Sequence, residues 1–176
     1  LQKTLRKRIG RAGEYHVPWF IELECDTGDF RRYLKQHSNN AALDLSPDIS
    51  SGSAIDVDVV DSFLCVSCSK EITNQEEGGS TWRDLLAGLN RYRDQQPVDG
   101  FIVSLLVQFL FGSEDQVAAT GRSVNELIQS AMRAFRMQIP VFLVVTDLWR
   151  IDGFESFTAL LSEREKEQAL GLGFGK

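Results

Sequence analysis

The chain has 176 residues, of which 43% are hydrophobic and 25% charged, and its formal net charge is -6. This length suits one compact domain that buries a core without a disulfide or metal. The acidic balance argues against a general nucleic-acid binder, and the longest apolar runs are far shorter than the roughly twenty residues that span a bilayer. Because the chain begins without methionine, we expect it to be part of a longer protein.

The first seventeen residues differ in charge from the rest of the chain. Five basic residues and no acidic residue fall within positions 1–11, namely Lys3, Arg6, Lys7, Arg8 and Arg11. One interpretation is a solvated terminal arm. The other is a segment beside an anionic membrane surface, where each basic side chain contributes about 1 kcal/mol. We therefore divide the chain into a basic, membrane-proximal lead at 1–17 and a domain at 18–176.

The first half of the domain predicts three strands and a short helix. Residues 19–23 follow Pro18 and alternate as a strand does. Asp29 stands at an N-cap position, before a short helix with apolar spacing. Residues 38–54 are rich in Ser, Asn, Asp and Gly and indicate a loop. Strands at 55–60 and 62–67 follow closely enough to pair with each other.

The second half predicts three helices and two strands. Thr81 begins a helix whose apolar side chains repeat at helical spacing. The continuous apolar runs 101–107 and 140–145 indicate strands buried on both faces. The long helix between them has an apolar stripe, and a last helix follows Gly153. The stripe of the long helix consists of Val117, Gly121, Val124, Ile128, Ala131 and Phe135, and that of the last helix of Phe154, Phe157, Leu160 and Leu161.

This alternation of strands and helices predicts an α/β fold with a mostly parallel, doubly wound sheet flanked by helices. In such sheets, ligands bind beyond the carboxyl ends of the strands. The turn after the first strand is therefore the place for a phosphate-binding loop.

That turn lacks the residues of a P-loop, which requires G-x-x-x-x-G-K-[ST] so that backbone N–H groups and a lysine hold the phosphates. Glu24 and Asp29 occupy the glycine positions, and Phe30 and Arg31 replace the Lys and Ser/Thr. Glu22 and Asp26 bring the number of nearby acids to four. An anionic turn repels a triphosphate, so ordinary nucleotide binding is not expected.

Cys65 and Cys68 form a C-x-x-C pair. A zinc site would need two more ligands from Cys25, His16 and His37. A redox pair should open a helix, whose dipole lowers the thiol pKa, whereas this pair lies in a predicted strand. We therefore interpret both cysteines as buried or half-buried thiols. The two histidines have no serine or cysteine partner that the sequence can place.

Two further groups of residues can be interpreted either as ordinary structural residues or as functional ones. Asp56, Asp58 and Asp61 alternate with valines, which indicates a solvated strand face; they lack the spacing of a known metal site. Trp149 and Arg150 follow a predicted strand at the expected ligand edge. They are candidates for a protein contact, with a tryptophan packed under a loop as the alternative.

Five segments together match one family pattern in unbroken order. They are 18–21 (P-W-F-I), 82–105 (W, then Y-R, then P-V-D-G-F-I-V-S-L), 140–146 (P-V-F-L-V-V-T), 153–157 (G-F-E-S-F) and 171–174 (G-L-G-F). These segments resemble the cytoplasmic NTPase-like domain of the IcmF/TssM inner-membrane proteins of type VI secretion systems, which have relatives in type IVB systems. The resemblance spans residues 18–174 and implies a Ras-like P-loop NTPase architecture.

The nucleotide elements of that family are altered in this chain. The P-loop is replaced by the acidic turn, and Val66 stands where the family has an Asp on the Mg²⁺ side. Asp147 and Trp149 replace the Lys and the base-recognising Asp of the family's T-K-x-D. The altered positions are Glu24, Asp29, Phe30, Arg31, Val66, Asp147 and Trp149. We interpret this as a fold kept for assembly after nucleotide chemistry was lost.

The resemblance thus implies a pseudo-NTPase docking domain at the cytoplasmic face of the bacterial inner membrane, without catalytic residues, metal or cofactor. It implies another inner-membrane subunit, baseplate proteins and further copies of the chain as partners, and no nucleic acid. One alternative is an NTPase that binds ATP or GTP through an unconventional loop and switches assembly. Another is an unrelated regulatory module in which the C-x-x-C pair is a redox or zinc switch.

Overall fold

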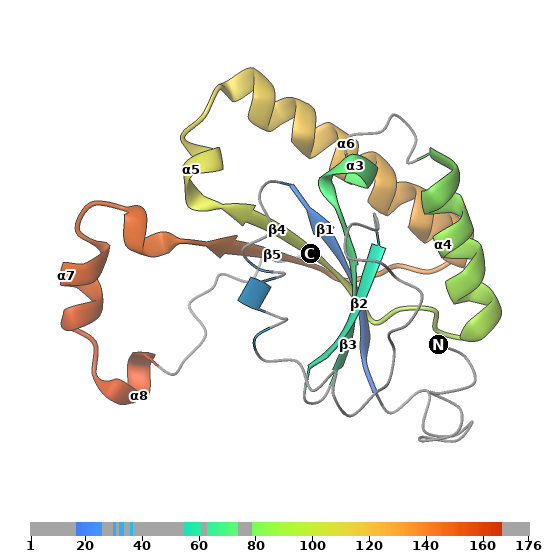
Figure 1. Cartoon of the computed structure of the whole chain (residues 1–176), viewed down its shortest axis with the longest axis horizontal. Coiled ribbons are helices and arrows are strands. Elements are labelled where there is room, and N and C mark those ends of the chain that lie inside the picture. The colour runs from blue at the N-terminus through green and yellow to red at the C-terminus, as the bar shows by residue number, and fades with distance from the viewer. Residues whose placement is uncertain are drawn as a thin grey trace.

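A computed structural model of the chain describes residues 17–25, 30, 32–33, 36, 55–60, 63–73 and 79–166 (Figure 1). Strands and helices alternate along most of this length. In chain order they are β1 (Trp19–Glu24), β2 (Ile55–Val60), β3 (Phe63–Cys68), α3 (Lys70–Thr73), α4 (Gly79–Tyr92), β4 (Gly100–Leu106), α5 (Val107–Leu110), α6 (Glu114–Phe135), β5 (Val141–Thr146), the 3-10 helix η3 (Leu148–Arg150), α7 (Phe154–Ala159) and α8 (Glu163–Lys166).

The strands form one five-stranded sheet in the order β2-β3-β1-β4-β5. β3, β1, β4 and β5 are parallel, and β2 pairs with β3 in the antiparallel sense. The predicted α/β class, the mostly parallel sheet and the pairing of the two early strands are confirmed. The chain leaves the central strand β1 toward β3 and later returns to its other side as β4, so the carboxyl end of β1 is a topological switch point.

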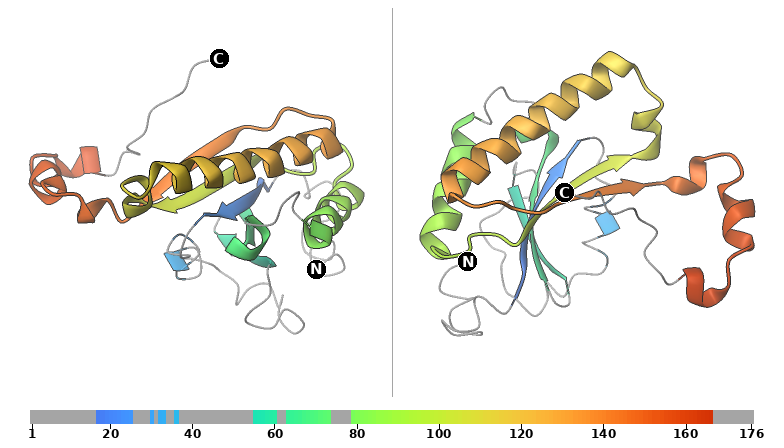
Figure 2. Two further views of the ribbon diagram at one scale, coloured as in Figure 1. Left: turned by 90° about the horizontal axis from the view of Figure 1, so that it is seen from above. Right: turned by 180° about the vertical axis from the view of Figure 1, so that it is seen from behind.

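One face of the sheet carries the main core. Alternate residues of β1, such as Ile21 and Leu23, are fully buried there, with Val66 of β3 and Phe101 of β4. The helices α3, α4 and α6 cover this face; α6 contacts both α3 and α4 (Figure 2).

The predicted long helix is confirmed, although its apolar stripe is shorter than expected. The buried residues of α6 begin at Val124 and continue to Phe135, whereas Gly121 is exposed and Val117 only half-buried. Figure 1 shows that the first half of α6 extends past α3 and α4. The stripe therefore packs only where the helix lies against its neighbours.

The second face of the sheet has a smaller apolar cluster. Cys65 and Ile102 are buried there, against the half-buried rings of Phe20, Phe30 and Phe63. Phe30 is one of the few described residues of the predicted first helix. Helical cover is thus seen on one face, and a doubly wound arrangement stays a prediction for the second face.

The prediction that 140–145 is a fully buried strand is wrong. β5 is an edge strand, and Val141, Phe142 and Leu143 are 47%, 49% and 53% exposed. The predicted last helix is also shorter and less buried than expected, since Leu160 is 85% exposed. In Figure 1, α7 and α8 lie beyond the carboxyl end of β5 and not on a face of the sheet, which explains their exposure.

No described helix combines the length and apolar character that crossing a membrane requires. The basic lead, including Lys3, Arg6, Lys7, Arg8 and Arg11, lies outside the described residues, so its membrane-proximal role stays a prediction.

Candidate functional site at the carboxyl edge of the sheet

The carboxyl ends of the parallel strands meet at one edge, where the sequence predicts a ligand site. Beside β1, the backbone N–H of Cys25 donates to the carbonyl of Ser104, 3.0 Å away. The hydroxyl of Thr73 donates to the carbonyl of Glu24 at 2.8 Å. The short helix α3 is thereby fixed against the end of β1.

The acidic turn after β1 differs from its prediction, because both of its described acids, Glu22 and Glu24, are buried. Glu22 lies inside β1 and is fully buried, and its carboxylate accepts a hydrogen bond from the Ser104 hydroxyl. It therefore adds no charge to the turn surface. Glu24, at the end of the strand, is 8% exposed, whereas Asp26 and Asp29 lie outside the described residues.

Of the two residues that replace the P-loop Lys and Ser/Thr, the structure describes Phe30 and not Arg31. Phe30 packs against the apolar cluster of the second face, and its ring stacks on Tyr33 with a centroid separation of 6.5 Å. Arg31 lies outside the described residues. The Phe30 ring is thus used for packing and offers no charge to a phosphate.

Val66 lies inside β3 and not after it. Its side chain is 3% exposed in the main core, and its backbone is paired with Ile21 and Val57. The residue that follows β3 is Ser69, whose hydroxyl donates to the carboxylate of Glu71. An apolar side chain at position 66 supplies no ligand for Mg²⁺, and its equivalence to the family's Asp rests on the resemblance.

At the end of β5 the chain forms a small charged and aromatic cluster. Asp147 has the left-handed φ of 58°, and its carboxylate pairs with Arg150 at 2.8 Å. The Arg150 guanidinium lies 4.8 Å from the centroid of the Trp149 ring, which is 59% exposed. The alternative of a tryptophan packed under a loop is therefore wrong. Both predicted contact residues are accessible, and their contact role stays a prediction.

Two further exposed apolar residues lie close to this cluster. Leu110 and Phe111 are 46% and 74% exposed, and α5, which Leu110 ends, lies against η3. We define Leu110, Phe111 and Trp149 as the apolar edge patch. Neither Leu110 nor Phe111 was predicted to be exposed, because the largely apolar stretch that begins with the predicted strand 101–107 continues to Phe111. The apolar pair before Gly112 was the available signal.

The two cysteines of the C-x-x-C pair lie on opposite faces of β3. Cys68 is in the main core and Cys65 in the cluster of the second face, and both are fully buried free thiols. Burial raises the pKa of the Cys65 thiol well above its usual range, and the nearby Glu22 carboxylate raises it further. The prediction of buried thiols is confirmed. A shared zinc site or a disulfide is incompatible with this strand geometry.

The solvated-face prediction for the aspartates of β2 is wrong for Asp58, which is 2% exposed and lies opposite Cys65. The reason is that the second face is covered at this point. Asp56 is half-buried, and Asp61 lies outside the described residues, as do His16 and His37. Within the described ranges, no three His, Cys, Asp or Glu side chains are close enough to hold a metal ion.

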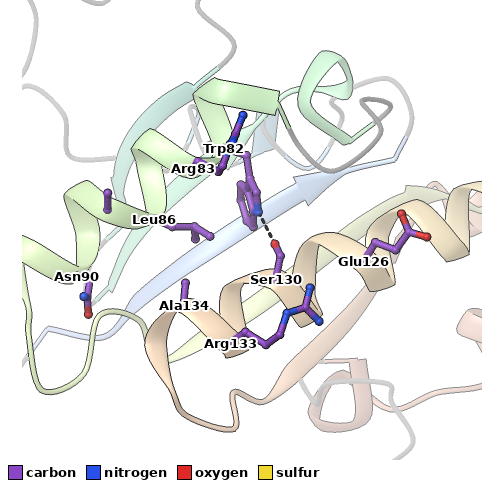
Figure 3. A pocket seen from close by; sticks show the side chains of 9 residues that line it. Trp82, Arg83, Leu86, Asn90, Glu126, Ser130, Arg133 and Ala134 are labelled. Atoms are coloured by element: carbon purple, nitrogen blue, oxygen red, sulfur yellow. Dashed lines mark hydrogen bonds between the residues drawn. The ribbon is translucent and has the colours of Figure 1, made fainter.

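A groove of about 650 Å³ runs between α4 and α6 (Figure 3). At its floor the indole N–H of Trp82 donates to the Ser130 hydroxyl at 2.8 Å. The exposed Arg83 and Arg133 lie along its sides, and its nine lining residues include no histidine, cysteine or aspartate. Glu126 adds a carboxylate to the same lining, so the groove offers apolar contacts and charges of both signs.

Four residues from two of the segments that carry the family resemblance meet at the opposite, amino end of the strands. Arg93 is fully buried, and it donates to the Asp99 carboxylate at 3.0 Å and lies over the Trp19 ring. Trp19 in turn stacks on Tyr92, with ring centroids 5.2 Å apart. We call Trp19, Tyr92, Arg93 and Asp99 the amino-end cluster. Its role is to join β1, α4 and β4.

The chain is thus an α/β domain whose carboxyl edge carries the exposed apolar edge patch beside the paired charges of Asp147 and Arg150. The chain belongs to the IcmF-related family, since a family model for the IcmF-related N-terminal domain matches residues 75–176. It is also similar to the type VI secretion system component TssM1 of Pseudomonas aeruginosa, with 28% identity over 96 residues. That match covers 54% of this chain and 9% of the relative, so the chain spans a small part of that protein.

Proposed function

We propose that this chain is a docking domain of a type VI secretion inner-membrane complex, with a Ras-like P-loop NTPase architecture and no working nucleotide site. It acts on the cytoplasmic side of the membrane. Its partners are another inner-membrane subunit, baseplate proteins and copies of the same protein. Membership of the IcmF-related family and the similarity to a type VI secretion component support this assignment.

The observation that carries the proposal is the chemistry of the carboxyl edge. At the switch point, where a phosphate loop would bind, the described residues include the acidic Glu24, the buried Cys25 and the packed ring of Phe30. At the end of β5, Asp147 is paired with Arg150, and Trp149 faces solvent. These groups do not fit a triphosphate, which needs cationic and N–H donors. They do fit a protein surface, because exposed tryptophan and arginine are typical of contact hot spots.

The central position of β1 and the antiparallel edge strand β2 support the Ras-like architecture. The amino-end cluster supports the retention of the framework, since its residues are those that resemble the family. A domain that keeps its fold through packing contacts, and whose ligand edge is altered, can still bind other subunits of a secretion complex.

The docking role is tested with Trp149→Asp, which puts a charge into the apolar edge patch, and Trp149→Phe as its matched control. Each variant chain is co-expressed with each candidate subunit of the same secretion system. The amount of subunit that co-purifies is then compared with the amount recovered with the unchanged chain. We expect Trp149→Asp to lower the recovery of at least one subunit about tenfold while Trp149→Phe retains it, because the aromatic contact survives. Equal recovery with both variants for every subunit would contradict docking through this edge.

A further inference from the structure

Among the strands that the structure describes, β5 lies at an edge of the sheet, and its composition is unusual for such a strand. Among the described strands its one neighbour is β4. Residues 141–146 read Val-Phe-Leu-Val-Val-Thr and contain no charge, glycine or proline. The opposite edge strand β2 carries Asp56 and Asp58, and inward or edge charges of this kind discourage pairing between sheets. The two edges of the sheet therefore differ, and β5 lacks that protection.

The backbone groups that face the open side follow from the pairing with β4. The N–H of Phe101 donates to the carbonyl of Pro140 at 2.9 Å, and Phe101 is in register with Val141. In a parallel sheet, each residue directs its N–H and its C=O toward the same neighbouring strand, and successive residues alternate between the two sides. The even-numbered residues of β5 thus bond to β4, and Val141, Leu143 and Val145 direct N–H and C=O groups outward. Pro140 is even-numbered, so the N–H that it lacks would have faced β4, and the open side loses no donor.

We infer that β5 is a self-pairing edge, which binds β5 of a second copy of this chain in the antiparallel sense with Leu143 on the two-fold axis. Leu143 then faces Leu143 of the second copy as a hydrogen-bonded pair, and Val141 faces Val145. The neighbouring pair is Phe142 with Val144, an aromatic and a β-branched residue, which is a favourable cross-strand combination. The result is one continuous ten-stranded sheet.

A second copy fits this edge better than a charged partner does. The strand is neutral, so two copies bring no like charges together within 141–146. The contact is isologous and closes at two chains, while β2 at each far end carries aspartates. The described helices that follow β5, α7 and α8, lie beyond its end and not alongside it (Figure 1). Six-residue strands bury less than a standard interface, so we expect a dissociation constant of about 10 µM.

The register is tested by cysteine cross-linking of the 176-residue chain. In Leu143→Cys the two new thiols face each other across the axis, with Cα atoms about 5.5 Å apart, within disulfide range. In the matched control Val141→Cys they are separated by four residues along the strand, roughly 13 Å or more. The native Cys25, Cys65 and Cys68 are buried and give little background. We expect disulfide-linked dimer from Leu143→Cys at least tenfold faster than from the control.

The association itself is tested by sedimentation equilibrium and by amide hydrogen exchange. Leu143→Lys should weaken the dimer at least tenfold because it brings two ammonium groups together, whereas Leu143→Thr should retain it. Three results would overturn the inference: equal cross-linking of both cysteine variants, no cross-linking of either, or a monomer at roughly millimolar concentration. A fourth is protection of the Leu143 amide in the dilute monomer, which would mean that the same chain supplies the pairing strand.

Discussion

Trp19 and Asp99 exchange two hydrogen bonds across the amino ends of β1 and β4. The backbone N–H of Trp19 donates to the Asp99 carboxylate at 2.7 Å, and the backbone N–H of Asp99 donates to the Trp19 carbonyl at 2.7 Å. The same carboxylate receives the buried Arg93 guanidinium at 3.0 Å. One acidic side chain thus joins a strand, a helix end and a second strand. The residues that most resemble the family consequently stabilise the fold.

Asp99→Ala should destabilise the domain by about 2–3 kcal/mol, because it removes the carboxylate partner of a buried guanidinium. Asp99 is itself partly exposed, which keeps the cost below that of a fully buried pair. Asp99→Asn keeps one oxygen acceptor and should cost less than half as much. Urea denaturation gives both free energies of unfolding, and equal losses for the two variants would contradict the expected contribution of the retained acceptor oxygen.

Gly100 is required by close packing at the start of β4. A Cβ atom at this position would lie 2.8 Å from the Phe20 ring and 3.0 Å from the Phe142 ring. Gly100→Ala should therefore cost about 1–3 kcal/mol through overpacking. Gly88→Ala is the matched control, since its Cβ would meet nothing within 4 Å, and in the helix α4 it should stabilise by about 0.5–1 kcal/mol. Thermal unfolding should shift in opposite directions for the two variants.

The hydrogen bond between Trp82 and Ser130 couples α4 to α6. Ser130→Ala leaves the buried indole N–H without this acceptor and should cost about 1–2 kcal/mol. Trp82→Phe removes the donor together with part of the buried ring. A double-mutant cycle isolates the bond, and we expect a coupling free energy of about 1 kcal/mol. A coupling of zero would show that the bond does not contribute to the packing of the two helices.

The buried Cys65 thiol predicts a specific pH dependence of stability. Its pKa is raised in the folded state, so above the unfolded thiol pKa of about 8.5 the unfolded chain loses a proton that the folded chain keeps. The free energy of unfolding should therefore fall by about 1.4 kcal/mol per pH unit from this group as pH rises above that value. Cys65→Ala should remove this slope. An unchanged slope in Cys65→Ala would contradict the assignment to Cys65.

The same geometry predicts that no disulfide or zinc site forms from Cys65 and Cys68. Intact mass after mild oxidation should show no Cys65–Cys68 bond in the folded protein, and metal analysis should find no zinc that depends on either thiol. A loss of two mass units, or one equivalent of zinc removed by Cys68→Ser, would show that β3 rearranges.

Periodicity predicted most of the fold, because each long element packs against the sheet along one stripe. The strand at β1 and the buried residues of α6 from Val124 to Phe135 illustrate this. The burial of β5 was predicted wrongly, since an apolar run looks the same in a central strand as in an edge strand. Whether Val141 and Leu143 are covered depends on elements elsewhere in the chain, and α7 turns away from them.

The site was less predictable because its contacts are long-range. Glu22 looked like part of an acidic turn, yet its carboxylate is bonded to Ser104, which is 82 residues away. Strand alternation alone could have placed Cys65 and Cys68 on opposite faces. Trp149 lies in η3 directly after the left-handed turn at Asp147, and sequence spacing does not determine how this short helix lies relative to the sheet.

The central claim is that the carboxyl edge serves docking and has no working nucleotide site. Isothermal titration calorimetry of the chain with Mg-ATP and with Mg-GTP tests it most directly. We predict no saturable heat at nucleotide concentrations up to roughly 1 mM, which corresponds to a binding free energy weaker than about -4 kcal/mol. Saturable binding at micromolar affinity, lost on changing the acidic turn, would contradict the claim and favour an NTPase with an unconventional loop.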